Sequence, residues 1–172
     1  MNRHEELAAN LAEVKSAIAH HCVGRDAATL IVVTKTWPAS DVRILAELGV
    51  TDVGENRDQE AHPKHDESVD LNLRWHCIGQ LQTNKVKSVA QWADVVHSVD
   101  RPSLVEALGK ALTQRSTPLQ ALIQVNLDPN PRDERGGCLP SEVLALADHI
   151  AGTPGLDLAG VMGVAPLEGS AE

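Results

Sequence analysis

Lys35 is the residue whose type and position point most directly to chemistry. It follows residues 29–34 (TLIVVT), an apolar run typical of a central parallel strand that helices cover on both faces. In parallel α/β folds, functional groups gather where the strands end, at their carboxyl side. An amine at such a position can lose part of its hydration, which favours the neutral form that attacks aldehydes. A plain alternative is that Lys35 caps the strand and extends into water.

The same rule selects residues that follow or lie within the other expected strands. Asn56 comes directly after the second strand, although it could instead cap the helix that follows. His76 lies within the third strand, where a histidine with satisfied core hydrogen bonds is common. Further candidates at strand ends are Glu55, Gly79, Gln80, Asn126, Met162 and Gly163, and a solvated helix start at Asn84 and Lys85 could attract a negative charge.

These candidates depend on an alternation of strands and helices. Apolar residues at positions 7, 11, 14 and 18 share one helical face, which predicts an amphipathic opening helix. Apolar runs predict strands at 29–34, 51–54, 74–79, 93–99, 119–126 and 156–163. Helices are expected between them at 40–48, 56–65, 84–92, 102–111 and 141–151, with Ser40 as an N-cap and a break near Pro63.

The repeating order of strand and helix implies a parallel sheet and an α/β fold in one domain, residues 1–172. Two architectures compete, an open doubly wound sheet and a (β/α)8 barrel. A barrel typically needs eight strands and about 200 residues or more. With 172 residues and six expected strands, the pattern alone favours an open sheet.

Composition narrows the function classes. The net charge of -9, from 15 Lys and Arg against 24 Asp and Glu, argues against a nucleic-acid-binding surface. No uncharged apolar run approaches the roughly 18 residues that would span a membrane, and the first residues do not have the pattern of a secretory signal. Cys22, Cys77 and Cys138 are few, odd in number and widely spaced. We therefore expect a reduced, cytoplasmic protein.

Five segments of the chain together resemble a known family. LIVVTKTWP (30–38), DVGENRDQE (52–60), RWHCIGQLQTNK (74–85), HSVDR (97–101) and LIQVN (122–126) are similar to strings of the pyridoxal phosphate homeostasis proteins. That family is related to the N-terminal barrel of alanine racemase. Its V-(S/T)-K-T-x-P, GEN and WHxIGxLQxNK motifs occur here in the same order, and the resemblance runs from about residue 4 to residue 165.

The resemblance implies a fold, a cofactor and a site. The fold would be a (β/α)8 TIM-barrel type related to the alanine racemase N-terminal domain, truncated to about six β/α units. The cofactor would be pyridoxal 5'-phosphate (PLP), held by Lys35 as a Schiff base, with Asn56 and His76 around its ring. The function would be PLP homeostasis: a carrier that exchanges PLP with an amine or with the lysine of an acceptor apoenzyme, without catalytic turnover.

This sequence also departs from the family pattern. The G-M-S-x-D and R-I-G-(T/S) strings, which in the family build the phosphate cradle, do not occur here, and the GGC turn at 136–138 is no evident substitute. The chain would then be either a fragment or a variant with altered binding. A barrel without its last two strands would also expose two strand edges, through which an otherwise monomeric chain could associate.

Four other interpretations compete with the carrier: a racemase-like enzyme, a non-binding fragment, a metal site and a nucleotide site. A racemase-like enzyme would need a second base, which is a Tyr in alanine racemase, whereas this chain has no Tyr. A non-binding fragment of the fold is the other alternative to a carrier. For a metal site, His20, His21, Cys22, His62 and His65 lack a ligand pattern, and no nucleotide-binding glycine motif follows the first strand.

Overall fold

In a computed structural model of the chain, the described residues are 2–24, 28–128 and 136–165. The helices are α1 (Arg3–His21), α2 (Ala39–Glu47), α3 (Asp58–Asp66), α4 (Val86–Trp92), α5 (Pro102–Ala111) and α6 (Val143–Ala151), with short 3-10 turns η1 (Thr83–Lys85) and η2 (Pro140–Glu142). The strands are β1 (Val32–Val33), β2 (Asp52–Glu55), β3 (Arg74–Cys77), β4 (Val95–Val99), β5 (Leu119–Val125) and β6 (Leu156–Gly163). Within the described ranges, no helix is long and apolar enough to cross a membrane.

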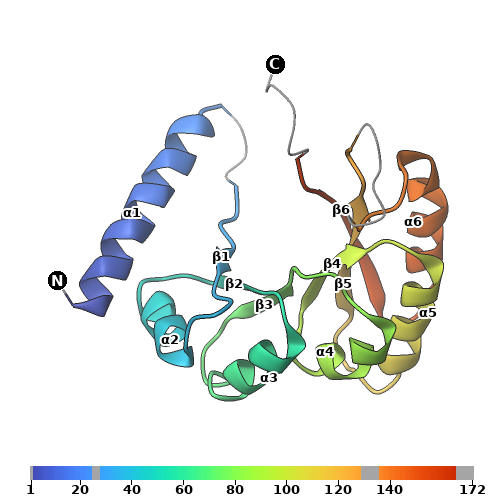
Figure 1. Cartoon of the computed structure of the whole chain (residues 1–172), viewed down its shortest axis with the longest axis horizontal. Helices are drawn as coiled ribbons and strands as arrows, with labels where there is room; N and C mark the ends of the chain where they lie inside the picture. Colours follow the sequence, from blue (N-terminus) through green and yellow to red (C-terminus); the bar gives the residue numbers. More distant parts are fainter. Residues whose placement is uncertain (1, 25–27, 129–135, 166–172) are drawn as a thin grey trace.

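All six strands pair in parallel, in the spatial order β1-β2-β3-β4-β5-β6. Figure 1 shows α2 to α6 following one another along one side of the curved sheet, with α1 set apart near β1. A doubly wound sheet reverses its strand order part-way and places helices on both faces. The expectation of an open doubly wound sheet is therefore wrong, and the barrel-type arrangement of six β/α units is confirmed.

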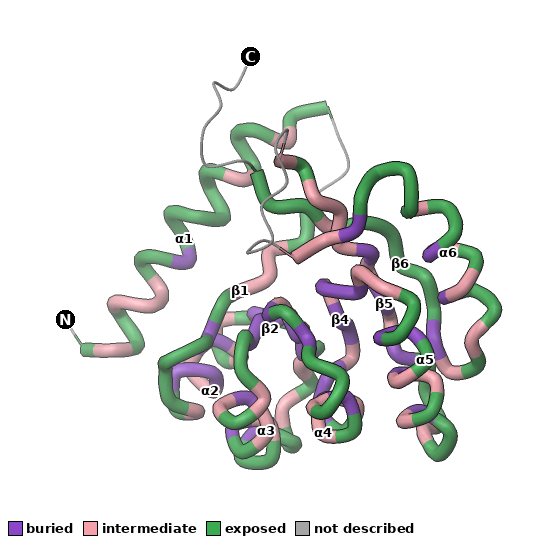
Figure 2. Tube along the Cα trace, turned by 45° about the vertical axis from the view of Figure 1, so that its right-hand side comes forward, coloured by how far each residue is buried: buried purple, intermediate pink, exposed green. Residues whose placement is uncertain are grey.

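The core lies between the sheet and its helices. The Trp75 indole of β3 contacts the Trp92 ring of α4 edge to face, with ring centroids 6.5 Å apart. Because side chains alternate along a strand, Val53 and Glu55 lie on the helix side with Trp75, whereas Gly54 and His76 face inward. Figure 2 shows buried residues concentrated on β2 to β5 and on the sheet-facing sides of the helices.

Strand β1 is shorter and more open than its apolar sequence predicts. The run 29–34 predicts a covered central strand, but β1 contains only two residues and pairs only with β2 among the described residues. Its Val33 side chain is 46% exposed. The prediction of a central strand is wrong because hydrophobicity reports the potential for burial, not the number of neighbouring strands.

Two helix predictions also need correction. Helix α2 begins at Ala39 with Pro38 as its N-cap, so Ser40 lies inside the helix. Pro63 lies inside α3 and does not end it. This helix continues because Ala61 and Lys64 are buried against the sheet, and tertiary contacts offset the hydrogen bond that a proline removes.

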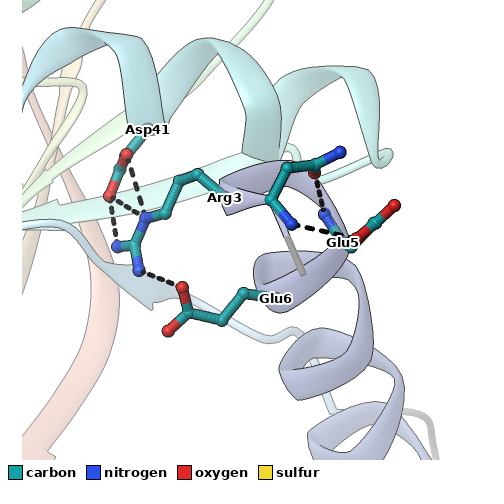
Figure 3. A network of polar contacts seen from close by, with 5 residues as sticks. Arg3, Glu5, Glu6 and Asp41 are labelled. Atoms are coloured by element: carbon teal, nitrogen blue, oxygen red, sulfur yellow. Dashed lines mark hydrogen bonds and ion pairs between the residues drawn. The ribbon is translucent and has the colours of Figure 1, made fainter.

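Helix α1 is attached to the rest of the fold by charged and aromatic contacts at its N-terminus. The Arg3 guanidinium binds both carboxylate oxygens of Asp41 on α2 and one oxygen of Glu6 (Figure 3). It also lies over the Trp37 ring, 4.4 Å from the centroid. Asn2 and Glu5 form a capping box that starts the helix. The N-terminal end of α1 is thereby fixed next to the loop that follows β1.

Candidate functional site

Lys35 and Asn56 follow neighbouring strands at the carboxyl edge of the sheet. Val33 of β1 pairs with Gly54 of β2, so each candidate lies two residues beyond this pair. Both side chains are exposed. The structure thus brings together two of the three residues predicted around a cofactor, as expected for parallel strand ends.

Lys35 occupies a tight and strained turn. The Trp37 amide donates to the Thr34 carbonyl at 3.1 Å, which leaves Lys35 and Thr36 as the two central residues of a β-turn. Thr36 has a φ of 67°, a left-handed conformation that costs a β-branched residue about 1–2 kcal/mol. Its amide donates to Glu60 Oε2 at 3.2 Å. This geometry persists because hydrogen bonds from outside the turn hold it.

A buried polar cluster lies directly beneath that turn. Glu55 Oε1 accepts hydrogen bonds from Thr34 Oγ1 at 2.6 Å and from Lys64 Nζ at 2.5 Å. The same ammonium donates to the Thr34 carbonyl oxygen at 2.8 Å. Glu55 is fully buried, and its Oε2 atom has no hydrogen-bond partner among the described residues. Sequence reasoning missed Lys64, because a lysine on a polar helix is normally solvated.

Asn56 lies tightly against the end of β3. A Cβ atom on Gly79 would stand 2.2 Å from the Asn56 carbonyl oxygen and 2.3 Å from its Oδ1 atom, so only glycine permits this approach. Ser98 Oγ in turn donates to the Gly79 carbonyl at 2.7 Å. The N-cap of α3 is Arg57, which makes no side-chain capping bond, so Asn56 is not the helix cap that the sequence left open. These contacts fix the ends of β2, β3 and β4 relative to one another.

His76 lies on the inner face of β3, below this edge, with both ring nitrogens engaged. Its Nε2 atom is 2.9 Å from Asp52 Oδ1, and its Nδ1 atom is 2.9 Å from His97 Nε2. Burial lowers the pKa of His76, against the raising effect of the Asp52 hydrogen bond. The structure therefore places His76 in a satisfied polar chain and does not bring it to the edge with Lys35.

Asp52 and His97, at the two ends of this series of hydrogen bonds, have shifted pKa values as well. Burial would raise the pKa of Asp52, but hydrogen bonds from Thr51 and His76 outweigh it and lower the pKa below its usual value. Burial, with a smaller contribution from His76, lowers the pKa of His97 to about 4. Asp52 is therefore ionised and both histidines are neutral near pH 7.

The described surface has pockets at opposite ends of the sheet. A pocket of about 220 Å³ lies at the carboxyl ends of β5 and β6, with Gln124, Asn126 and Gly136 in its wall. A larger pocket of about 340 Å³ lies between α1 and the starts of β1 and β2, lined partly by Lys15 and Cys22. Of these two, the smaller one is on the same edge as Lys35.

The histidines considered as metal ligands have other surroundings. His62 Nδ1 lies 3.0 Å from Ser88 Oγ, and the His65 ring packs edge to face on Trp75. His20 and His21 contact each other on exposed turns of α1. Across the ranges that the structure describes, no group of three or more His, Cys, Asp or Glu residues is arranged to hold a metal ion.

Comparison with known proteins gives consistent matches over most of the chain. The family described as "Alanine racemase, N-terminal domain" matches residues 3–171. A pyridoxal phosphate homeostasis protein of Corynebacterium glutamicum is 41% identical over 163 residues, which are 91% of this chain and 72% of the relative. The protein of that name from Mycobacterium leprae is 38% identical, in a match that covers 96% of this chain and 72% of the relative.

Solved structures of related proteins have the same fold as this chain over most of its length. PipY of Synechococcus elongatus, in a structure with PLP bound, superposes with a TM-score of 0.79 at 31% identity, over 94% of this chain and 71% of PipY. An alanine racemase of Corynebacterium glutamicum gives a TM-score of 0.60 at 16% identity, over 86% of this chain and 44% of the racemase. The second match concerns the fold alone.

Proposed function

The chain belongs to the family of pyridoxal phosphate homeostasis proteins, within the group that shares the alanine racemase N-terminal domain, and on that premise we propose that it binds PLP at Lys35. The proposed role is intracellular PLP homeostasis: the chain holds the cofactor as a Schiff base and releases it without turning over a substrate. When bound, PLP supplies an aldehyde that reacts with amines and a conjugated ring that absorbs visible light.

The observation that carries this proposal is the position of Lys35. Its amine is exposed at the carboxyl edge of the sheet, on a turn whose backbone is held from two sides. The Nζ atom would attack the aldehyde carbon, and the carbonyl oxygen would leave as water when the C=N bond forms. For release, an amine or an apoenzyme lysine would add to the same carbon, and the bond from that carbon to Lys35 Nζ would break.

Asn56 and His76 have different parts in the proposal. Asn56 is pressed against Gly79 and follows the strand next to the one that precedes Lys35, and its side-chain amide would donate or accept a hydrogen bond at the cofactor. His76 keeps the inner face of the sheet in place below that edge, through Asp52 and His97. We therefore assign direct contact to Lys35 and Asn56, and an indirect contribution to His76.

A role without turnover fits the groups near Lys35. Racemisation needs a second base on the other face of the reacting carbon. The chain has no Tyr, both nitrogens of His76 are already engaged, and burial raises the pKa of Cys77 to about 12. The names of the relatives also describe homeostasis proteins.

Further parts of the proposal concern surroundings and partners. The acceptors would be PLP-dependent apoenzymes. The three cysteines are free, which suits a reducing compartment such as the cytoplasm. We propose a monomer, with the outer edges of β1 and β6 as the sites where association would begin.

The decisive experiment is chemical trapping. The purified chain is mixed with PLP, its visible spectrum is recorded, the bond is reduced with borohydride, and the labelled peptide is identified by mass spectrometry. One label per chain at Lys35, absent in Lys35→Ala with an unchanged circular dichroism spectrum, is the expected result. Label scattered over surface lysines, or no label, would support a non-binding form of the fold, and racemisation of an amino acid by the loaded chain would support an enzyme.

A further inference from the structure

Lys64 is unusual among the six lysines of this chain because it is buried. Its side chain is 7% exposed, and its ammonium contacts the Glu55 carboxylate and the Thr34 carbonyl. Lysine is almost never buried without a partner. The Glu55 carboxylate explains why the buried charge is tolerated. The hydrogen bond from Lys64 to the Thr34 carbonyl oxygen adds a contact with the residue that directly precedes Lys35.

Every polar atom of Thr34 is engaged. Its amide donates to the Gly54 carbonyl at 3.0 Å, and its hydroxyl donates to Glu55. Its carbonyl oxygen accepts from both Lys64 Nζ and the Trp37 amide, which uses both lone pairs. The backbone on the amino side of Lys35 is therefore fixed by β2 and α3 together.

The carboxyl side of Lys35 is held from the same helix. Thr36, in its left-handed conformation, donates its amide hydrogen to Glu60. Glu60 and Lys64 are four residues apart on α3, so they lie one above the other on one helix face. One face of α3 thus contacts the turn on both sides of Lys35.

We propose that Glu60 and Lys64 form a clamp in which Lys64 is a positioning residue for Lys35. The clamp keeps residues 34–37 in the strained turn and sets the direction in which the Lys35 side chain leaves the backbone. This inference rests on the proposed function for its consequence: a pre-oriented amine loses less conformational freedom on binding PLP than a lysine on a mobile backbone.

The test compares the double variant Glu55→Gln/Lys64→Met with the wild type. Removing both charges avoids an unpaired buried carboxylate, and the amide oxygen introduced by Glu55→Gln can still accept the Thr34 hydroxyl. Lys87→Met, which removes an exposed lysine of α4, is the matched control. Circular dichroism and urea unfolding establish that each variant folds.

Two measurements test whether the clamp fixes the turn. The first is hydrogen exchange of the Trp37 amide, which needs no cofactor, and we expect exchange about tenfold faster in the double variant. The second is the ratio of borohydride-trapped PLP at Lys35 to that at Lys15, Lys85, Lys87 and Lys110, which should fall about tenfold. For Lys87→Met, the ratio is taken over the three remaining lysines. Both quantities should stay at wild-type values in this control.

The outcomes separate the two proposals. A folded double variant with wild-type Trp37 exchange and wild-type selectivity overturns the clamp. If the wild type itself shows no preference for Lys35, the proposed function fails, and Trp37 exchange alone decides the clamp. If the double variant does not fold, Glu60→Ala at the more exposed end of the clamp replaces it, with the same two readouts and the same criteria.

Discussion

The imidazoles of His76 and His97 are joined by a hydrogen bond of 2.9 Å between Nδ1 and Nε2. Asp52 is ionised, so His76 must donate through Nε2, which leaves its Nδ1 as the acceptor of a hydrogen from His97. A proton added to His76 would place two donors face to face. The hydrogen bonds between Asp52, His76 and His97 are therefore satisfied only when both imidazole rings are neutral.

This arrangement predicts a loss of stability in mild acid. The pKa of His97 is about 4 in the folded state against about 6.5 unfolded, so the unfolded chain binds more protons in that interval. The part of the unfolding free energy that depends on neutral His97 is fully present above about pH 6.5 and is lost as the pH falls toward 4. For a half-buried ring we expect a loss of about 1–2 kcal/mol, measured by urea unfolding at pH 7.5, 6, 5 and 4.5.

The variant His97→Gln isolates this effect. Gln keeps a donor for His76 but does not titrate. The unfolding free energy of the variant should therefore change less than that of the wild type between pH 6.5 and 4. Asp52, Arg74 and Asp94 also influence the neighbouring His76 and are unchanged in this variant. His20→Gln, on an exposed turn of α1, should follow the wild type. Equal slopes for the wild type and His97→Gln would contradict the assignment.

Gly79→Ala should damage both stability and the site. The new methyl group would overlap the Asn56 carbonyl and side-chain oxygens, and the backbone oxygen cannot move without displacing the end of β2. Overpacking of this kind costs about 1–3 kcal/mol. We expect unfolding at lower urea and weaker PLP trapping at Lys35. Gly152→Ala, at the end of α6, should stay within about 0.5 kcal/mol of wild type, and an equally mild effect at Gly79 would count against the close packing.

Arg3→Ala should loosen α1 without unfolding the sheet. The substitution removes the bonds to Asp41 and the stacking on Trp37. Hydrogen exchange in the first half of α1 should be faster by about fivefold, while β2 to β5 exchange as in wild type. Arg43→Ala, which breaks the exposed ion pair between Arg43 of α2 and Asp70 of the loop after α3, is the control. Unchanged α1 exchange would show that its apolar face alone holds it.

The three thiols should differ sharply in reactivity. Cys22 is half-buried at the end of α1, whereas Cys77 and Cys138 are buried. Burial raises the pKa of both buried thiols, that of Cys77 to about 12, and only thiolates react quickly. Iodoacetamide at pH 8 should modify Cys22 first in the native chain and all three residues in urea, as read by mass spectrometry. Rapid labelling of native Cys77 would contradict its burial.

The sequence predicted the alternation of strands and helices and the edge of the sheet at which Lys35 and Asn56 lie. Each strand was found within a few residues of its position because its apolar run ends at polar or turn residues. Lys35 and Asn56 lie at neighbouring strand ends, because parallel strands all end at the same edge, and their roles toward a cofactor stay predictions. The pattern alone favoured an open sheet, and only the family resemblance indicated the barrel-type arrangement that the structure has.

Other features depend on tertiary contacts that local sequence does not encode. Nothing in the polar segment of α3 distinguishes Lys64 from solvated lysines, and Pro63 beside it predicts a break in the helix that does not occur. Asp52, His76 and His97 come from three strands, so their hydrogen-bonded chain depends on strand register. Gly79 resembles an ordinary turn glycine until the position of Asn56 is known.

Each strand from β2 to β6 pairs with the strand that precedes it in the chain, since order in space repeats order in the chain among the described residues. The contacts between neighbouring strands therefore close short stretches of chain, and each new strand meets an edge that is already formed. Assembly can proceed from β1 to β6 during synthesis, one β/α unit at a time. The turn that carries Lys35 and the α3 face that contacts it both lie between β1 and β3 in the chain, so these contacts need none of the later strands.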